Sequence, residues 1–258
     1  MNIVVCMKVT PKIEQIKFDE VKKTIIREGV ENEINDADKN ALEAALKLKD
    51  SAGGKVVVLS MGPPSFEPFL RLAVAMGADD AVLLSDRAFG GADTFATSRV
   101  LAAGIEKLKP FDVVLCGEAS SDGSTEQVPP SIAGWLGIPH VSYVSEIAMA
   151  GDRLKARREI TDGHEVVEVK PPVLASVQLG CNSPRFPDFR RKRWADKEFK
   201  LRVMTNQDLA FAPSDIGLEG SRTEVTGLSR MRSPERRREF IQGTEDEVTR
   251  RLVEIVRA

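Results

Sequence analysis

Residues 38–60 read DKNALEAALKLKDSAGGKVVVLS, and this stretch decides the expected fold. Apolar residues stand at positions 41, 42, 45 and 46, which is the spacing of one face of a helix. Asn35, followed by Asp38, resembles a capped helix start. Gly53 and Gly54 end the predicted helix, and residues 55–60 form a nearly continuous apolar run. Such a run is typical of a strand whose two faces are both covered by helices.

The same alternation extends to both sides of this stretch. Further strands are predicted at residues 3–7, 81–85 and 112–116, and further helices at about 67–76, 93–109 and 128–136. Strands and helices that alternate in this way pair in parallel with right-handed crossovers. The sequence therefore predicts an α/β fold with a doubly wound, mostly parallel, Rossmann-like sheet. Ligands of such sheets bind outside the carboxyl ends of the strands.

The pattern changes in the last part of the chain. Strands are predicted at 141–150, 153–159, 164–170 and 173–178, with hairpin turn signals between them. Residues 182–194 mix basic and aromatic residues without clean periodicity, and 244–257 predict an amphipathic helix. We expect a nucleotide-binding domain over residues 1–181. Residues 182–258 are expected to form an extended arm and a C-terminal helix that pack on a partner chain.

Composition excludes several classes of protein. The 258 residues include 37 Lys and Arg against 39 Asp and Glu, a net charge of −2, which argues against a nucleic-acid-binding protein. The apolar runs are far shorter than the roughly 20 residues of a spanning helix, so no insertion into a membrane is expected. The start of the chain lacks the features of a secretory signal, so a cytoplasmic location is expected.

The spacing of the cysteines and histidines and the distribution of charge bear on disulfides, metal sites and partners. Cys6, Cys116 and Cys181 are odd in number and far apart, which argues against a disulfide framework and fits a reducing cytoplasm. His140 and His164 have no neighbouring ligand pattern, so no metal site is predicted. Residues 182–258 carry 17 Lys and Arg against 13 Asp and Glu, on an otherwise acidic chain. This basic end indicates either docking on an acidic partner or a solvated surface.

Residues 115–130, LCGEASSDGSTEQVPP, carry the clearest chemical signal. They follow a predicted strand and lead into a predicted helix. Small residues let backbone N–H groups approach an anion, Ser124 and Thr125 add hydroxyl donors, and the helix N-terminus adds partial positive charge. The segment predicts a phosphate or pyrophosphate site, and an ordinary capped loop is the alternative. Neither G-x-G-x-x-G nor G-x-x-x-x-G-K-[ST] occurs.

Other strand ends should line the same crevice. They are residues 6–8 after the first strand, residues 61–62 after the next and the helix start at 35–38. No nucleophile with a matching base is visible, and no G-x-S-x-G elbow occurs. A nucleotide pocket without catalytic side chains favours a cofactor carrier over a hydrolase or transferase, and leaves open whether the chain is an enzyme.

At these residues the sequence closely resembles the β subunits of electron transfer flavoproteins, over nearly the whole chain. Residues 3–9 resemble the family's first strand and short basic loop, and 35–45 its helix start, with Asp36 in place of the usual proline. Residues 60–63, 77–79 and, most closely, 122–139 also match. Residues 182–186 resemble the family's Asn-x-Pro-Arg-Tyr stretch.

The resemblance implies a heterodimer with an α subunit, in which the FAD common to the family lies mostly in the α subunit. The β subunit holds a second nucleotide. In simple carriers this is a structural AMP, and the partners are acyl-CoA-type dehydrogenases and a quinone oxidoreductase. In bifurcating members it is a second FAD, which accepts a hydride from NADH. That flavin sends one electron to ferredoxin or flavodoxin and the other, through the α-subunit FAD, to a dehydrogenase.

The loop at 122–130 is more similar to the bifurcating group's Asp-Gly-Asp-Thr-Ala-Gln-Val-Gly-Pro than to the loop of the AMP carriers. Ser124, Glu126 and Pro129 depart from that pattern. The alternatives are a simple carrier with AMP and a non-redox adenine-nucleotide module. An ATP-dependent ligase or pyrophosphatase would need a Ser-Gly-Gly-x-Asp-Ser loop, which residues 6–11 lack.

The resemblance also implies site residues. The nucleotide contacts would be Cys6, Asn35, Asp36, Ala37, Asp38, Met61, Ser120, Ser121, Asp122, Gly123, Ser124, Thr125, Gln127 and Val128. The segment 182–200 matches the recognition loop that docks on a dehydrogenase, with Phe189 at the apolar anchor, and a disordered basic linker is the alternative. Its partner contacts would be Pro184, Arg185, Phe186, Phe189, Arg190 and Arg191. No catalytic residue and no metal ligand is implied.

Overall fold

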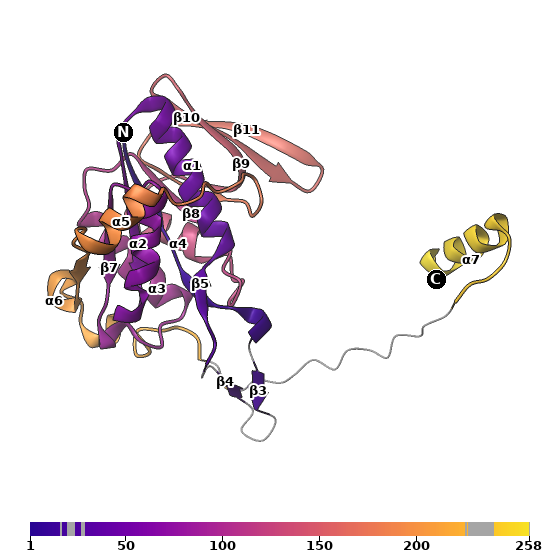
Figure 1. Ribbon diagram of the computed structural model, residues 1–258, viewed down its shortest axis with the longest axis horizontal. Coiled ribbons are helices and arrows are strands. Elements are labelled where there is room, and N and C mark those ends of the chain that lie inside the picture. The colour runs from indigo at the N-terminus through magenta and orange to yellow at the C-terminus, as the bar shows by residue number, and fades with distance from the viewer. Residues whose placement is uncertain (16, 20–23, 27–28, 225, 227–239, 258) are drawn as a thin grey trace. The chain divides into compact units, whose positions relative to one another are not determined.

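The computed structural model describes residues 1–15, 17–19, 24–26, 29–224, 226 and 240–257 (Figure 1). The chain divides into two compact units, Met1–Thr226 and Gly227–Ala258. In the described part of the second unit, one helix, α7 (Glu245–Arg257), is formed. It has the predicted amphipathic character: Leu252, Val253, Ile255 and Val256 are exposed, large and apolar.

The first unit is built on a nine-stranded sheet in the order β11-β10-β9-β12-β8-β1-β6-β7-β13. The strands from β9 to β13 in this order are parallel, and the β10–β11 hairpin adds an antiparallel edge. The strand bounds are β1 (Asn2–Cys6), β6 (Lys55–Met61), β7 (Asp80–Leu84), β8 (Val113–Gly117), β9 (His140–Ala150), β10 (Arg153–Ile160), β11 (Gly163–Val169), β12 (Val173–Val177) and β13 (Arg202–Met204). The predicted doubly wound, mostly parallel sheet is confirmed.

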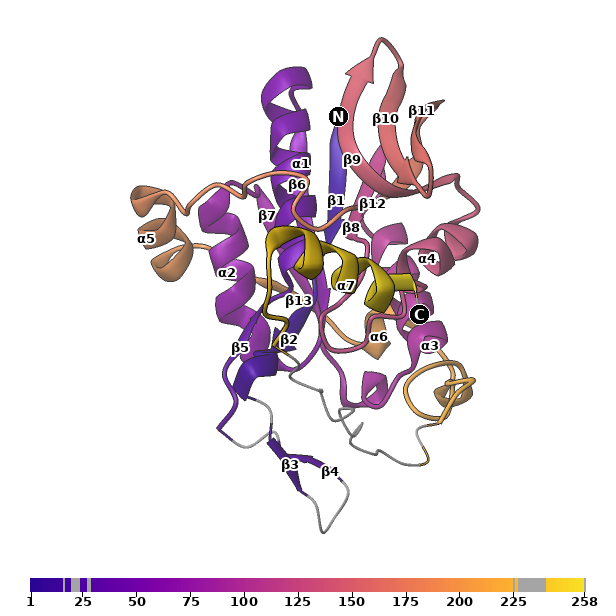
Figure 2. The same cartoon turned by 90° about the vertical axis from the view of Figure 1, so that its right-hand side faces the viewer.

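Helices cover both faces of the sheet (Figure 2). The helices α1 (Asp36–Ala52) and α2 (Glu67–Met76) pack on one face, where Ile3, Leu42 and Leu70 belong to one buried cluster. The helices α3 (Thr94–Glu106) and α4 (Val128–Leu136) pack on the other face, where Val4, Ile105 and Ile132 belong to a second cluster. Alternate side chains of β1 therefore enter opposite clusters, as a two-sided sheet requires.

Nearby glycine, proline and capping residues account for several of the helix ends. Gly77, with φ of 136°, ends α2 at the predicted residue, and the predicted bounds of α4 are also confirmed. The α3 helix is shorter than predicted and ends at Glu106. Pro110 disfavours helical backbone at the residue before it, which explains part of this difference. Asp93 caps α3, because its side chain accepts a hydrogen bond from the Ala96 backbone N–H.

Short strands and 3-10 turns that the sequence analysis did not predict join the main elements. Strands β2 (Val9–Pro11) and β5 (Asn32–Ile34) form one antiparallel pair, and β3 (Lys17–Asp19) and β4 (Thr24–Ile26) form another. The 3-10 turns are η1 (Ile13–Gln15), η2 (Pro64–Phe66), η3 (Arg87–Phe89) and η4 (Pro213–Asp215). These pieces lie outside the alternation of longer elements on which the prediction rests.

The segment after residue 182 corrects the expectation of an aperiodic arm. It contains the helix α5 (Phe189–Lys197), capped by Asp188, and α6 (Asn206–Leu209). Arg191 anchors α5 on α2 by donating hydrogen bonds to the carbonyls of Val74 and Ala78. Because β13 then joins the sheet beside β7, the first compact unit extends to Thr226 and not only to residue 181. The contact of residues 182–258 with a partner stays a prediction.

One buried carboxylate joins three elements of the first unit. Asp38, in the first turn of α1, is 6% exposed. Its Oδ2 accepts the backbone N–H of Lys8 at 2.8 Å, after β1, and its Oδ1 accepts that of Gly117 at 2.8 Å, at the end of β8. Burial raises the pKa of Asp38 to about 6, although both N–H groups oppose the shift.

The close approach of α1 to β8 requires glycine at position 117. A Cβ on Gly117 would lie 2.5 Å from Asp38 Oδ1 and 2.7 Å from the Ala37 carbonyl carbon. We expect Gly117→Ala to lower the free energy of unfolding by about 1–3 kcal/mol. Gly134→Ala in α4 is the control, because nothing lies within 4 Å of its Cβ, and it should add about 0.5–1 kcal/mol. Equal stability of the two variants in urea unfolding would contradict this packing.

Asp38 should also give stability a measurable pH dependence. The unfolded carboxyl loses its proton near pH 4, whereas the folded carboxyl keeps it until about pH 6. The unfolded state therefore binds fewer protons in this window, and the stability of the wild type falls by up to about 3 kcal/mol as the pH rises through it. Asp38→Asn removes the ionisation. Urea unfolding of both proteins from pH 4.5 to 7 should show the free energy of unfolding of the variant rising relative to that of the wild type as the pH increases. A difference in free energy that stays constant with pH would refute the assignment.

Candidate functional site

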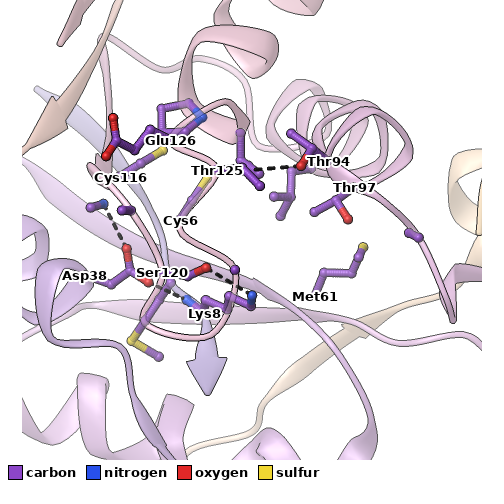
Figure 3. A pocket seen from close by; sticks show the side chains of 18 of the residues that line it. Cys6, Lys8, Asp38, Met61, Thr94, Thr97, Cys116, Ser120, Thr125 and Glu126 are labelled. Atoms are coloured by element: carbon purple, nitrogen blue, oxygen red, sulfur yellow. Dashed lines mark hydrogen bonds between the residues drawn. The ribbon is translucent and has the colours of Figure 1, made fainter. Parts of the chain in front are cut away.

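A cavity of about 440 Å³ opens at the carboxyl ends of the parallel strands. The chain runs from β1 to β6 and β7 on one side, then returns to β8 on the other side of β1. The cavity lies at this reversal, since Cys6 of β1 and Cys116 of β8 both line it (Figure 3). Doubly wound sheets bind ligands at such a point, and the volume is typical of small-molecule sites.

The loop between β8 and α4 forms one wall. Ser124 turns it back, because its backbone N–H and its Oγ both donate to the Ser120 carbonyl, at 2.9 and 3.1 Å. Ser124 and Glu126 have φ of 46° and 57°, in the left-handed region that non-glycine residues adopt at a cost of about 1–3 kcal/mol each. Left-handed residues among right-handed ones are typical of the backbone concavities that bind anions.

Asn35 holds this loop instead of capping α1. Its Nδ2 donates to the Ala119 carbonyl at 2.8 Å, and its Oδ1 accepts the Ser121 N–H at 3.1 Å. No side-chain cap hydrogen bond is formed at the start of α1. Asn35 therefore stands at the predicted N-cap position, but the predicted side-chain cap is wrong, because the amide pairs with both a donor and an acceptor in the loop.

Lys8 is the one basic side chain among the described residues that line the cavity. Its Nζ lies 2.5 Å from Asp122 Oδ1 and 3.2 Å from Ser120 Oγ. Partial burial opposes the ionisation of Asp122, but the hydrogen bond and charge of Lys8 outweigh it and lower the pKa of that carboxyl. Lys8 remains 46% exposed, so it can also reach an anion in the cavity.

The start of α3 forms the opposite wall and was missed by the sequence analysis. Gly91, Asp93, Thr94 and Thr97 line it (Figure 3). Thr94 Oγ1 reaches Thr125 Oγ1 at 3.3 Å, which links the two walls. The available signal was position, because this segment follows the predicted strand at 81–85 and so had to lie at the same edge of the sheet as the other strand ends.

Asp93 fixes that wall to a later part of the chain. Its Oδ2 accepts the backbone N–H groups of Arg222 and Thr223 at 2.8 and 2.9 Å and the Thr223 hydroxyl at 2.9 Å. Burial would raise the pKa of Asp93, but the hydrogen bonds from Ala96, Thr223 and Arg222 together lower it. The carboxylate therefore stays ionised and holds the 222–223 segment on the rim of the cavity.

The fourteen predicted nucleotide contacts divide into two groups. Cys6, Asp38, Met61, Ser120, Gly123, Thr125 and Val128 line the cavity. Asn35, Asp36, Ala37, Ser121, Asp122, Ser124 and Gln127 are not among its lining residues. Of these, Asn35, Asp122 and Ser124 shape the loop, whereas Asp36 is exposed and pairs with Lys39 at 2.7 Å.

The predicted partner contacts also divide by role. Phe186 and Phe189 are 93% and 82% exposed, and Arg190 is exposed. Arg185 is tied to the buried Glu43 at 2.8 Å and to Asp50 at 2.8 Å, and Pro184 beside it is half-buried. Hydrogen bonds to Glu43 and Asp50 raise the pKa of Arg185, so the guanidinium stays charged. Arg185 and Arg191 hold the segment on α1 and α2, while the two phenylalanines project from it.

Two features are absent among the described residues. These residues contain no group of three or more His, Cys, Asp or Glu side chains arranged to hold a metal ion. Among the helices in the described ranges, none combines the length and the apolar character needed to cross a membrane.

The lining fits an adenine nucleotide. The lining residues Phe89, Leu101 and Val128 offer apolar surface to a base and a ribose, whereas Lys8, Ser120 and the loop amides offer donors to phosphate oxygens. Small residues at 91, 92, 117, 119 and 123 allow the backbone to approach a ligand closely. The lining residues include no histidine and no serine paired with a base.

Comparison with known proteins gives the family. Residues 22–203 match the electron transfer flavoprotein domain. The chain is 44% identical to the electron transfer flavoprotein subunit β of Thermoanaerobacterium thermosaccharolyticum over 98% of its length and 97% of that protein. It is 52% identical to the same subunit of Clostridium acetobutylicum, over 87% of this chain and 86% of that protein. It is also 44% identical to the caffeyl-CoA reductase–Etf complex subunit CarD of Acetobacterium woodii, over 87% of this chain and 86% of that protein. The chain therefore belongs to the electron transfer flavoprotein family, as a β subunit.

Proposed function

We propose that this chain binds a second FAD in the cavity between β1, β8 and α3, and that it works in electron bifurcation with an α subunit. The observation that carries the proposal is the loop at residues 120–127, held at the reversal of the sheet with Lys8 beside it. Phosphate groups of a nucleotide would bind at this loop. The apolar part of the lining would hold the adenosine.

The choice of FAD over AMP rests on the loop sequence. Residues 122–130 are more similar to the bifurcating group than to the AMP carriers. The departure at Ser124 is compatible with this choice, because its hydroxyl is used within the loop, on the Ser120 carbonyl, and does not need to reach a ligand. One relative is named as a subunit of a caffeyl-CoA reductase–Etf complex and another as an electron transfer subunit of acryloyl-CoA reductase, names consistent with a partner that reduces an acyl-CoA.

In this proposal the protein supplies placement. Bound FAD would supply the hydride acceptance from NADH and the electron transfer, as a cofactor can do without catalytic side chains. Lys8 and the loop amides would hold the phosphates, and Thr94 and Thr97 would flank the ligand from α3. Ferredoxin or flavodoxin would take one electron. A dehydrogenase docked near Phe186 and Phe189 would receive the other through the α-subunit flavin.

Nucleotide content of the heterodimer tests the proposal directly. We expect this chain, co-expressed and purified with its α subunit, to release two FAD and no AMP per dimer on denaturation, and the native dimer to be reduced by NADH. One FAD with one AMP, without reduction by NADH, would instead identify a simple electron carrier. Absence of flavin, with tight ATP binding by the chain, would indicate a non-redox nucleotide module.

Lys8 provides a test that does not depend on which nucleotide is bound. Lys8→Met removes the cation and leaves the Asp122 carboxylate unneutralised beside the phosphates. A hydrogen bond to a charged group contributes about 1.5–3 kcal/mol, so we expect the dissociation constant of the nucleotide to rise about tenfold or more.

The matched control is Lys12→Met. Lys12 pairs with Glu31 at 2.6 Å and is not among the lining residues of the cavity. Its loss should leave nucleotide affinity unchanged, measured by titrating the nucleotide-depleted heterodimer. Equal nucleotide affinities of the Lys8 and Lys12 variants would show that Lys8 does not contact the phosphates.

A further inference from the structure

Two cysteines stand side by side at the floor of the cavity. The parallel register of β1 and β8 pairs Val5 with Leu115, and Cys6 and Cys116 are the next residues of the two strands. Neighbouring strands lie about 4.8 Å apart, within the range of about 4.4–6.8 Å between the Cα atoms of a disulfide. Both side chains belong to the buried cluster under α3 and α4, so they project from the same face of the sheet.

The two thiols already interact. Figure 3 shows the sulfur atoms of Cys6 and Cys116 next to each other. The interaction with Cys6, together with burial, raises the pKa of Cys116, so this thiol keeps its proton at neutral pH. The side chains are 6% and 4% exposed, yet both line the cavity, so a molecule the size of a peroxide has a route to them.

We propose that Cys6 and Cys116 form a reversible disulfide when the cavity admits a peroxide, and that bound nucleotide protects them. The third cysteine takes no part, because Cys181 is half-buried and does not line the cavity. The proposal does not depend on whether the nucleotide is FAD or AMP.

The chemistry balances with hydrogen peroxide as oxidant. The Cys6 sulfur, as thiolate, attacks one peroxide oxygen, the O–O bond breaks, and a sulfenic acid and hydroxide form. The Cys116 sulfur then attacks the sulfenic sulfur, the S–O bond breaks and the S–S bond forms. The two thiol protons leave with the two oxygens, so two thiols and one peroxide give one disulfide and two waters. A dithiol reductant reverses the step by thiol–disulfide exchange.

The disulfide would alter the nucleotide site. An S–S bond of about 2.05 Å brings the two sulfur atoms much closer than two thiols can lie, so its formation moves both side chains at the ends of β1 and β8. Those ends carry Lys8 and Gly117, whose backbone N–H groups are held by Asp38. Because both cysteines line the cavity, the moved side chains change the surface offered to a nucleotide, so the oxidised protein should bind nucleotide more weakly.

The experiment treats the full-length heterodimer, depleted of nucleotide, with hydrogen peroxide and maps disulfides by mass spectrometry after alkylation and proteolysis. The expected result is a peptide that joins Cys6 to Cys116, lighter by two hydrogens than its two reduced parts and lost on treatment with dithiothreitol. Prior addition of FAD or AMP, whichever the complex carries, should slow its formation at least tenfold. Nucleotide affinity should fall at least tenfold on oxidation and recover on reduction.

Variants separate the pair from the third cysteine. Cys181→Ser should form the linked peptide at the wild-type rate, whereas Cys6→Ser and Cys116→Ser should form none. Mapping of the wild type decides the question even where a variant fails to fold. A peroxide-treated wild type in which Cys6 and Cys116 remain unlinked, or in which either joins Cys181, overturns the pairing. Equal rates with and without nucleotide overturn the protection.

Discussion

The carboxylate of Asp38 is the interaction on which the cavity at the strand ends depends. It is buried, and each of its oxygens accepts the backbone N–H that follows or ends a central strand, at Lys8 and at Gly117. The first turn of α1 is thereby fixed to β1 and β8 at the point where the strand order reverses. Because the two contacts come from different strands, they set the separation of the cavity floor and the direction in which Lys8 leaves the sheet.

The residues of the site have two roles. Some hold its loops in place, and others would face a ligand. Asn35 and Asp93 satisfy backbone groups of two separate loops, and Ser124 closes a turn within its own loop. None of these three needs to touch a nucleotide to be necessary for its binding. A rigid frame of this kind lets small residues and backbone amides do the recognition, at little cost in conformational entropy when the ligand binds.

The parts predictable from sequence are those governed by local rules. The fold class and the bounds of α2 and α4 follow from apolar periodicity and from glycine and proline at helix ends. The helix α5 was not predictable in this way, because its anchorage comes from Arg191 reaching carbonyls of α2, more than 100 residues earlier in the chain. The role of Asn35 was misjudged for the same reason, since its partners lie 84 and 86 residues away.

The segment that carries Phe186 and Phe189 has a consequence for the lifetime of a complex. Arg185 and Arg191 order its backbone before any partner arrives, so docking loses little loop freedom and association can be fast. The exposed large apolar side chains of the segment are few, Phe186, Phe189 and Trp194, so the proposed docking would bury little area and dissociation would be fast as well. A contact that forms and breaks quickly suits a protein that must meet one partner after another, because throughput then depends on encounter frequency and not on the strength of any single complex.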